Sequence, residues 1–191
     1  FFAIIISMNK SRIEALTDGI FAVVMTLTVL EFKVPEDGNL FSPNVLLMLL
    51  IYVTTFVALA SIWNSLHHVM TFIKSNKIDE LILWSNHWIL LIVCLFPFST
   101  VAHAEHPNSL TASLAYVSTY LIRWISLIVF SQIIYKQYNG SATLRKRNLE
   151  RIKIFLVFLL PGALISLVWL YALPIVTILM AINWGRHSNF D

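Results

Sequence analysis

The sequence predicts an all-α membrane protein with six transmembrane helices. Of its 191 residues, 58% are hydrophobic and only 12% are charged, whereas soluble domains are usually about 45–50% apolar and about 25% charged. Apolar runs that approach or exceed the roughly 20 residues needed to cross a bilayer recur along the chain. Lysine and arginine gather in alternate loops between these runs, which agrees with an even number of spans.

The expected helices follow the apolar runs and their breaks, at about residues 15–34, 43–72, 81–104, 110–135, 152–171 and 174–185. Pro35 and Gly38 interrupt the chain after the first run, and Ser42 is the expected N-cap of the second. The last apolar block is too long for one span, and Pro174 divides it. Residues 8–191 thus form one domain. Residues 1–7 are too short to span, and we expect them to be extraneous to a natural start at Met8.

The basic residues also predict the orientation. Two lie at the N-terminus, two in the 73–80 turn, six in the 136–153 linker and one in the tail, whereas the opposite loops carry only Lys33. Because cytoplasmic loops are rich in lysine and arginine, both termini are expected in the cytoplasm. The net charge of +3 therefore reflects membrane topology, and no nucleic-acid partner is expected.

The first helix has an unusual pattern of charge. Arg12 and Asp18 precede a stretch, residues 19–30, that has no charge at all. A carboxylate near lipid needs a partner, although the positive end of the helix dipole favours it. At about 100° per residue, one narrow stripe collects the branched apolar side chains Leu16, Val23, Leu27, Leu30 and Val34. Thr26 flanks this stripe and Asp18 points away. Such a stripe is also typical of a packing seam.

This stretch resembles the motif Arg-x-x-x-Phe-Ser-Asp, followed by Gly-x-x-Ala and an apolar run ending in Leu-Glu-x-x-x-Pro. That motif marks the transmembrane protein 175 family, the lysosomal potassium channels and their bacterial counterparts. The matching residues are Arg12, Leu16, Thr17, Asp18, Gly19, Phe21, Ala22, Leu30, Glu31 and Pro35. Leu16 replaces the phenylalanine and Thr17 the serine, and both changes keep the size or the hydrogen bonding of the side chain.

The resemblance implies a potassium-selective channel, without a cofactor, in a bacterial plasma membrane. The animal proteins contain two six-helix units and work as dimers, so a single-unit chain is expected to form a homotetramer. The first helix of each subunit would line an axial pore, with a constriction at Val23, Leu27 and Leu30. Apolar rings can gate by dewetting and select by the cost of dehydrating an ion. Thr26 is the possible ion ligand, and either it or the rings would set selectivity.

Trp63 and His67 stand four residues apart on the second helix and therefore share a face. In the family, a tryptophan and a histidine of this region hydrogen-bond with the arginine and aspartate of the first helix. The resemblance thus implies a buried network of Arg12, Asp18, Trp63 and His67, although the neighbouring His68 is an alternative equivalent. An interfacial tryptophan beside solvated histidines would have the same spacing.

The other residues that could have a function are weaker candidates. Arg123 lies near the middle of the fourth helix, where a charge is either functional or held by an ion pair or by snorkelling. Residues 96–100 form a Phe-Pro-Phe-Ser-Thr element that favours a helix kink. Cys94 stands alone, so it predicts a buried apolar residue. His103 and His106 flank Glu105, but we expect no metal site there.

The remaining patterns separate the classes of function. The chain has no Thr-Val-Gly-Tyr-Gly filter and none of the phosphate-loop, zinc-protease or serine-hydrolase motifs, so it is not expected to be an enzyme. A proton-coupled secondary transporter that uses Asp18 and His67 is the main alternative, but transporters often have inverted repeats and broken helices. Here the Thr-Asp-Gly element occurs once. A scaffolding protein with the 136–151 linker as its contact surface is the third interpretation.

Overall fold

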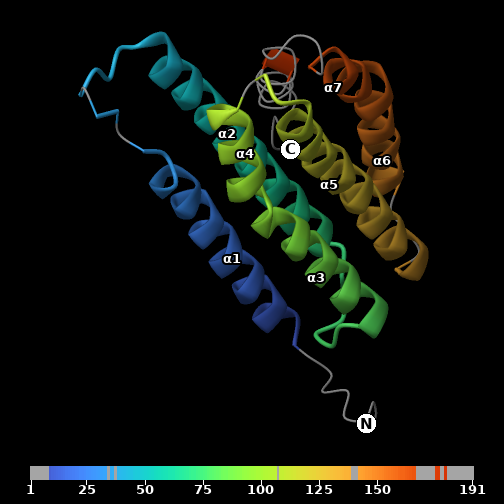
Figure 1. Ribbon diagram of the computed structural model, residues 1–191. Coiled ribbons are helices and arrows are strands. Elements are labelled where there is room, and N and C mark those ends of the chain that lie inside the picture. Colours follow the sequence, from blue (N-terminus) through green and yellow to red (C-terminus); the bar gives the residue numbers. More distant parts are fainter. Residues whose placement is uncertain are drawn as a thin grey trace.

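The computed structural model describes residues 9–33, 35–36, 38–106, 108–138, 142–166, 175–176 and 179. Within these ranges the regular structure is helical, and its only β-type pairing is an isolated bridge between Asn9 and Lys77. The elements are α1 (Lys10–Leu30), α2 (Pro43–Met70), α3 (Glu80–Cys94), α4 (Phe96–Glu105), α5 (Leu110–Gln137), α6 (Ala142–Ile154), η1 (Phe155–Leu159) and α7 (Leu160–Ser166). Figure 1 shows the long helices side by side, with α1 at one edge of the bundle and α6 at the other.

Four segments of the described chain are long and apolar enough to cross a membrane: α1, α2, Glu80–Glu105 and α5. The predicted all-α class is therefore confirmed, and the first four expected spans overlap these four candidate spans. The fifth expected span, 152–171, overlaps the end of α6, η1 and α7. The sixth, 174–185, lies outside the described residues apart from 175–176 and 179.

The helix that includes the fifth expected span begins ten residues earlier than expected. Residues 142–151 were assigned to a polar linker because of their charge, but they form most of α6. This helix has one buried face, on which Leu144, Asn148 and Arg151 pack against the bundle. The apolar pattern of a single leucine was too weak to reveal an amphipathic helix, since the other two buried residues are polar.

The ends and the break of the helices follow local chemistry. Ser42 caps α2 as expected, because its hydroxyl accepts a hydrogen bond from the Val45 backbone N–H at 3.4 Å, and Pro43 occupies the first turn. The third span breaks at Leu95, between α3 and α4, as the Phe-Pro-Phe element predicts. There the Ser99 hydroxyl donates to the Phe96 carbonyl at 3.2 Å, and that of Thr100 pairs with Thr55 of α2 at 3.3 Å.

One end of the bundle gathers the segments that carry most of the basic residues. The Lys10 backbone N–H donates to the Asn76 carbonyl at 2.9 Å, and its Nζ donates to the Ile73 carbonyl at 3.2 Å. These bonds join the start of α1 to the α2–α3 loop. Figure 1 shows this loop, the start of α1 and the last turns of α5 at the same end, with the α1–α2 loop at the other.

This arrangement predicts which loops lie on the same side of the membrane. The test uses a variant in which Cys94 is replaced, because this cysteine is exposed on α3. Cysteines placed at the exposed positions Asn76 and Lys136 should react with a membrane-impermeant maleimide from the same side of the membrane, and one at Asn108 only from the other side. Labelling of intact cells before and after permeabilisation measures this difference. Labelling of all three positions from one side would contradict the four-span arrangement.

Candidate functional site

A polar contact joins α1 to α2 near the basic end of the bundle. The Trp63 indole N–H donates a hydrogen bond to the Asp18 carboxylate at 2.7 Å. The Trp63 ring also stacks on His67, with 6.0 Å between ring centroids and 24° between ring planes. These three residues line a shallow pocket together with Glu14, Thr17 and Met70. The carboxylate thus has a partner in the same chain, which an acid in a membrane helix needs.

The structure does not bring the fourth residue of the expected network to this contact. Arg12 is exposed, and within the described residues no hydrogen bond or salt bridge connects it to Asp18. His67 meets the site by ring stacking rather than by a hydrogen bond to the carboxylate. Asp18 and Trp63 lie on the surface of the single chain, with Trp63 39% exposed.

Behind this contact lies a buried hydrogen bond that the sequence did not reveal. Asn86 of α3 donates from Nδ2 to the Thr17 hydroxyl at 3.1 Å, and both side chains are buried. The Asn86 Oδ1 atom has no partner in the described part of the chain. The signal in the sequence was the side-chain amide of Asn86 in a largely apolar helix, because such a group requires a hydrogen-bond partner inside the bundle. This bond ties α1 to α3.

The opposite side of α1 is largely apolar and is exposed on the single chain. The inward side buries Ile13, Thr17, Phe21, Val24 and Thr28, which recur every three or four residues. On the outward side, Val23 is 54%, Leu27 42% and Leu30 75% exposed. The expected stripe is therefore not a packing seam inside this chain.

Thr26 belongs to the outward side as well. Its hydroxyl donates back into the helix, towards the Val23 carbonyl at 2.8 Å and the Ala22 carbonyl at 3.1 Å. Because the hydroxyl proton is engaged with the backbone, the oxygen lone pairs remain available to an outside ligand.

Arg123 is held by aromatic rings inside the bundle. Its guanidinium carbon lies 5.9 Å from the ring centroid of Phe96, 5.3 Å from that of Tyr120 and 5.3 Å from that of Trp124. The side chain is buried, and no salt bridge to it is present among the described residues. Cation–π attraction strengthens when the pair is desolvated. This arrangement differs from both the ion pair and the snorkelling expected as structural alternatives.

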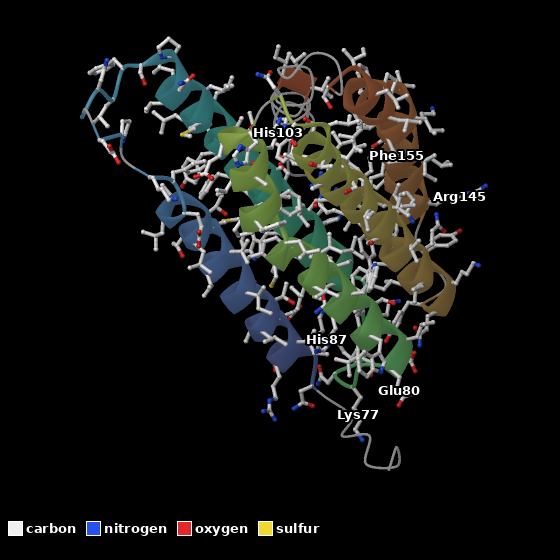
Figure 2. The ribbon with its side chains drawn as sticks, in the orientation of Figure 1. Lys77, Glu80, His87, His103, Arg145 and Phe155 are labelled. Carbon is white, nitrogen blue, oxygen red and sulfur yellow. The ribbon has the colours of Figure 1, made fainter. Side chains whose placement is uncertain are left out.

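His103 also turns inward. Its ring stacks on Tyr116 with centroids 4.7 Å apart and planes within 9°, and its Nδ1 lies 3.3 Å from the Ser113 hydroxyl. Figure 2 places His103 on α4, far from the labelled His87 at the other end of the third span. The histidine is thus part of the packed interior rather than a surface ligand beside Glu105. Cys94, by contrast, is exposed on the single chain and not buried as expected.

The helical bundle, its four candidate spans and the partnered acid in α1 define a multi-pass membrane protein. Residues 12–97 match the family model described as the endosomal/lysosomal potassium channel TMEM175. The match covers most of the first half of the chain, and both this family model and the curated relatives are described as potassium channels rather than as enzymes.

Curated relatives are similar to this chain over comparable lengths. A potassium channel of Chryseobacterium sp. (strain P1-3) is 37% identical over 94 residues, which are 49% of this chain and 48% of the relative. A potassium channel of Chamaesiphon minutus is 30% identical over 123 residues, covering 59% and 60% of the two chains. One of Streptomyces collinus is 28% identical over 138 residues, covering 67% and 64%. The chain therefore aligns with between about half and just under two thirds of each relative's length.

A solved structure supports the fold over nearly the whole chain. The crystal structure of a lysosomal potassium-selective channel TMEM175 homologue from Chamaesiphon minutus superposes with a TM-score of 0.72 at 24% identity. The match covers 94% of this chain and 98% of that one. The likeness therefore extends well beyond residues 12–97.

The buried α1–α3 bond makes a stability prediction. Thr17→Val removes the hydroxyl while keeping the shape of the side chain, and it leaves the Asn86 amide without a partner. A buried polar group that loses its partner destabilises the protein by about 1–3 kcal/mol. The free energy of unfolding of the purified variant should therefore fall by that amount. Thr17→Ser keeps the hydroxyl and is the matched control. Equal stability of Thr17→Val and the unchanged protein would show that the bond contributes nothing.

Proposed function

We propose that this chain is one subunit of a potassium-selective cation channel in which α1 lines the pore. The observation that carries the proposal is the two-sided character of α1, with one face buried in the bundle and an opposite face that is exposed and, over residues 19–30, carries no charge. The curated relatives, each described as a potassium channel, support the same function. Potassium ions are then the permeant species, and no cofactor is required.

The α1–α2 surface favours assembly from several copies. A lone apolar face would suit lipid as well as a pore, but beside it lie Asp18 and Trp63, whose hydrogen bond is on the surface of the single chain. Asp18 stands eight residues into α1, about 12 Å along the helix. A carboxylate at such a depth is costly against lipid. Protein or water should therefore cover this side of the molecule.

A homotetramer satisfies this requirement. Four copies around one axis form a closed ring, so every subunit makes the same contacts and no α1–α2 surface is left open. The assembly lies in a bacterial plasma membrane with both termini in the cytoplasm, the orientation that the basic end of the bundle favours. Arg12, exposed near the start of α1, then becomes available to a neighbouring subunit.

The constriction of this pore is formed by Val23, Leu27 and Leu30. Four-fold rings of these side chains exclude water, and an ion that crosses them loses hydration without gaining a ligand. Potassium releases its water more readily than sodium, so the barrier is lower for potassium. No separate filter loop is involved. The Thr26 hydroxyl, whose proton is directed to the helix backbone, offers an oxygen to the passing ion.

Ion flux tests the function directly. Liposomes that contain the purified protein and a potassium gradient should show rapid, passive potassium flux, slower with sodium, and a potassium ionophore sets the full response. Saturable flux coupled to protons would instead support the secondary transporter that uses Asp18 and His67. Absence of flux from correctly assembled protein would support a scaffolding role and end the channel proposal.

Leu30→Ser should increase the conductance by widening and wetting the ring. A rise of about tenfold corresponds to a barrier lowered by about 1.4 kcal/mol, and the preference for potassium over sodium should fall with it. Val29→Ser is the matched control, because Val29 is 42% exposed but lies on another side of α1. Thr26→Ala should keep the conductance and lower only the selectivity. Current recordings that show no effect of Leu30→Ser would remove the apolar gate.

A further inference from the structure

Helix α6 carries a concentration of positive charge. It contains Arg145, Lys146, Arg147, Arg151 and Lys153, and Glu150 is its one acid. Most of these side chains are exposed, and Arg145 extends away from the bundle in Figure 2. Arg151 is the exception, because it is 0% exposed and packs towards α5. A buried cation needs compensation from within the structure.

The contacts of Arg151 satisfy only one edge of its guanidinium. Its Nη1 donates to the Ser131 hydroxyl of α5 at 3.0 Å and to the Asn148 side-chain oxygen at 3.5 Å. Ser131 in turn donates to the same Asn148 oxygen. The Arg151 Nε and Nη2 atoms and the Asn148 Nδ2 atom are buried without partners in the described part of the chain. Several donors therefore stand together without an acceptor.

Two further basic groups surround this site. Arg147 lies one helical turn before Arg151, where like charges repel each other. His68 of α2 is near enough to both arginines to interact with their charges, and its buried Nε2 has no hydrogen-bond partner among the described residues. We name Ser131, Asn148, Arg147, Arg151 and His68 the α6 basic cluster. No salt bridge reaches these five residues from the described chain.

The charge of the cluster persists at neutral pH. Burial, and then the charge of Arg147, lower the pKa of Arg151 to about 10, so this side chain remains protonated. Two positive side chains with free donors, in a partly desolvated site that no salt bridge from the described residues reaches, favour an anion that accepts several hydrogen bonds. The planar fork of arginine matches the oxygens of a phosphate group.

We propose that the α6 basic cluster binds a phosphate-type anion at the basic end of the bundle, with the free edge of Arg151 and the side chain of Arg147 as its main ligands. The partly exposed Arg147 and His68 mark the side of entry. The anion would join α6 to α2 and α5. The proposal concerns binding alone and stands independently of the channel function.

The depth of the cluster in the membrane is compatible with two sources of a phosphate group. His68 is in the last turn of α2, and Ser131 is within the last two turns of α5. Both positions are close to the end of the bundle that carries the basic loops. The headgroup of an anionic phospholipid reaches this level of a membrane, and so does a free phosphate from the aqueous side.

Binding to the purified full chain tests the proposal with two probes. Inorganic phosphate should raise the melting temperature more than chloride does at equal ionic strength, or phosphatidylglycerol should be retained in native mass spectrometry in preference to phosphatidylcholine. The first result identifies a free anion as ligand and the second a lipid headgroup. Absence of both effects would overturn the proposal.

Variants locate the site. Arg151→Gln should weaken binding of the effective probe about tenfold or more, equivalent to about 1.4 kcal/mol, and Arg151→Lys should weaken it less because the charge remains. Arg145→Gln is the matched control, since it removes the same charge from an exposed position on the same helix. If Arg151→Gln does not fold, Arg147→Gln replaces it. If Arg145→Gln and Arg147→Gln weakened binding of the probe equally, the effect would be one of general surface charge, and the proposed site would be rejected.

Discussion

Polar side chains inside an apolar bundle need hydrogen-bond partners within the protein, and this constraint determines the position of α1 in the bundle. Thr17 turns inward to the amide of Asn86, and the next residue, Asp18, receives the indole N–H of Trp63. The two adjacent bonds point to different helices, α3 and α2. They therefore determine the rotation of α1 about its axis as well as its position. Once this rotation is set, Val23, Leu27 and Leu30 face outward.

The same constraint has a different solution at the buried cations. Arg123 lies among three aromatic rings, whose negative faces stabilise its charge without a carboxylate. Arg151 has no comparable rings among the described residues and is left with two buried nitrogens, Nε and Nη2, without a hydrogen-bond partner, whereas in Arg123 this holds for Nε alone. One buried arginine is thus compensated by its own chain, whereas the other is only partly compensated. This contrast separates a packing role from a binding role for two residues of the same type.

The helix break in the third span determines how the polar side chains of α4 pack. The break at Leu95 lets α4 turn its polar side chains towards α2 and α5, where Thr100 meets Thr55 and His103 stacks on Tyr116. Hydroxyl groups there satisfy one another or the local carbonyls, so these polar atoms find partners inside the bundle. In the proposed channel, the pore lies between subunits rather than within one.

Local features of the sequence were sufficient for the first four spans, the Ser42 cap and the break before Pro97, because span length, capping and proline geometry depend on neighbouring residues. The apolar stripe of α1 also follows from its periodicity, but its exposure on the single chain comes from the tertiary structure. Only the tertiary structure decided that Asn86 is the partner of Thr17, that aromatic rings hold Arg123, and that residues 142–151 form a helix with Arg151 buried. These outcomes depend on contacts between segments far apart in the chain, and a pattern along one helix carries no information about which side chain of another helix will face it.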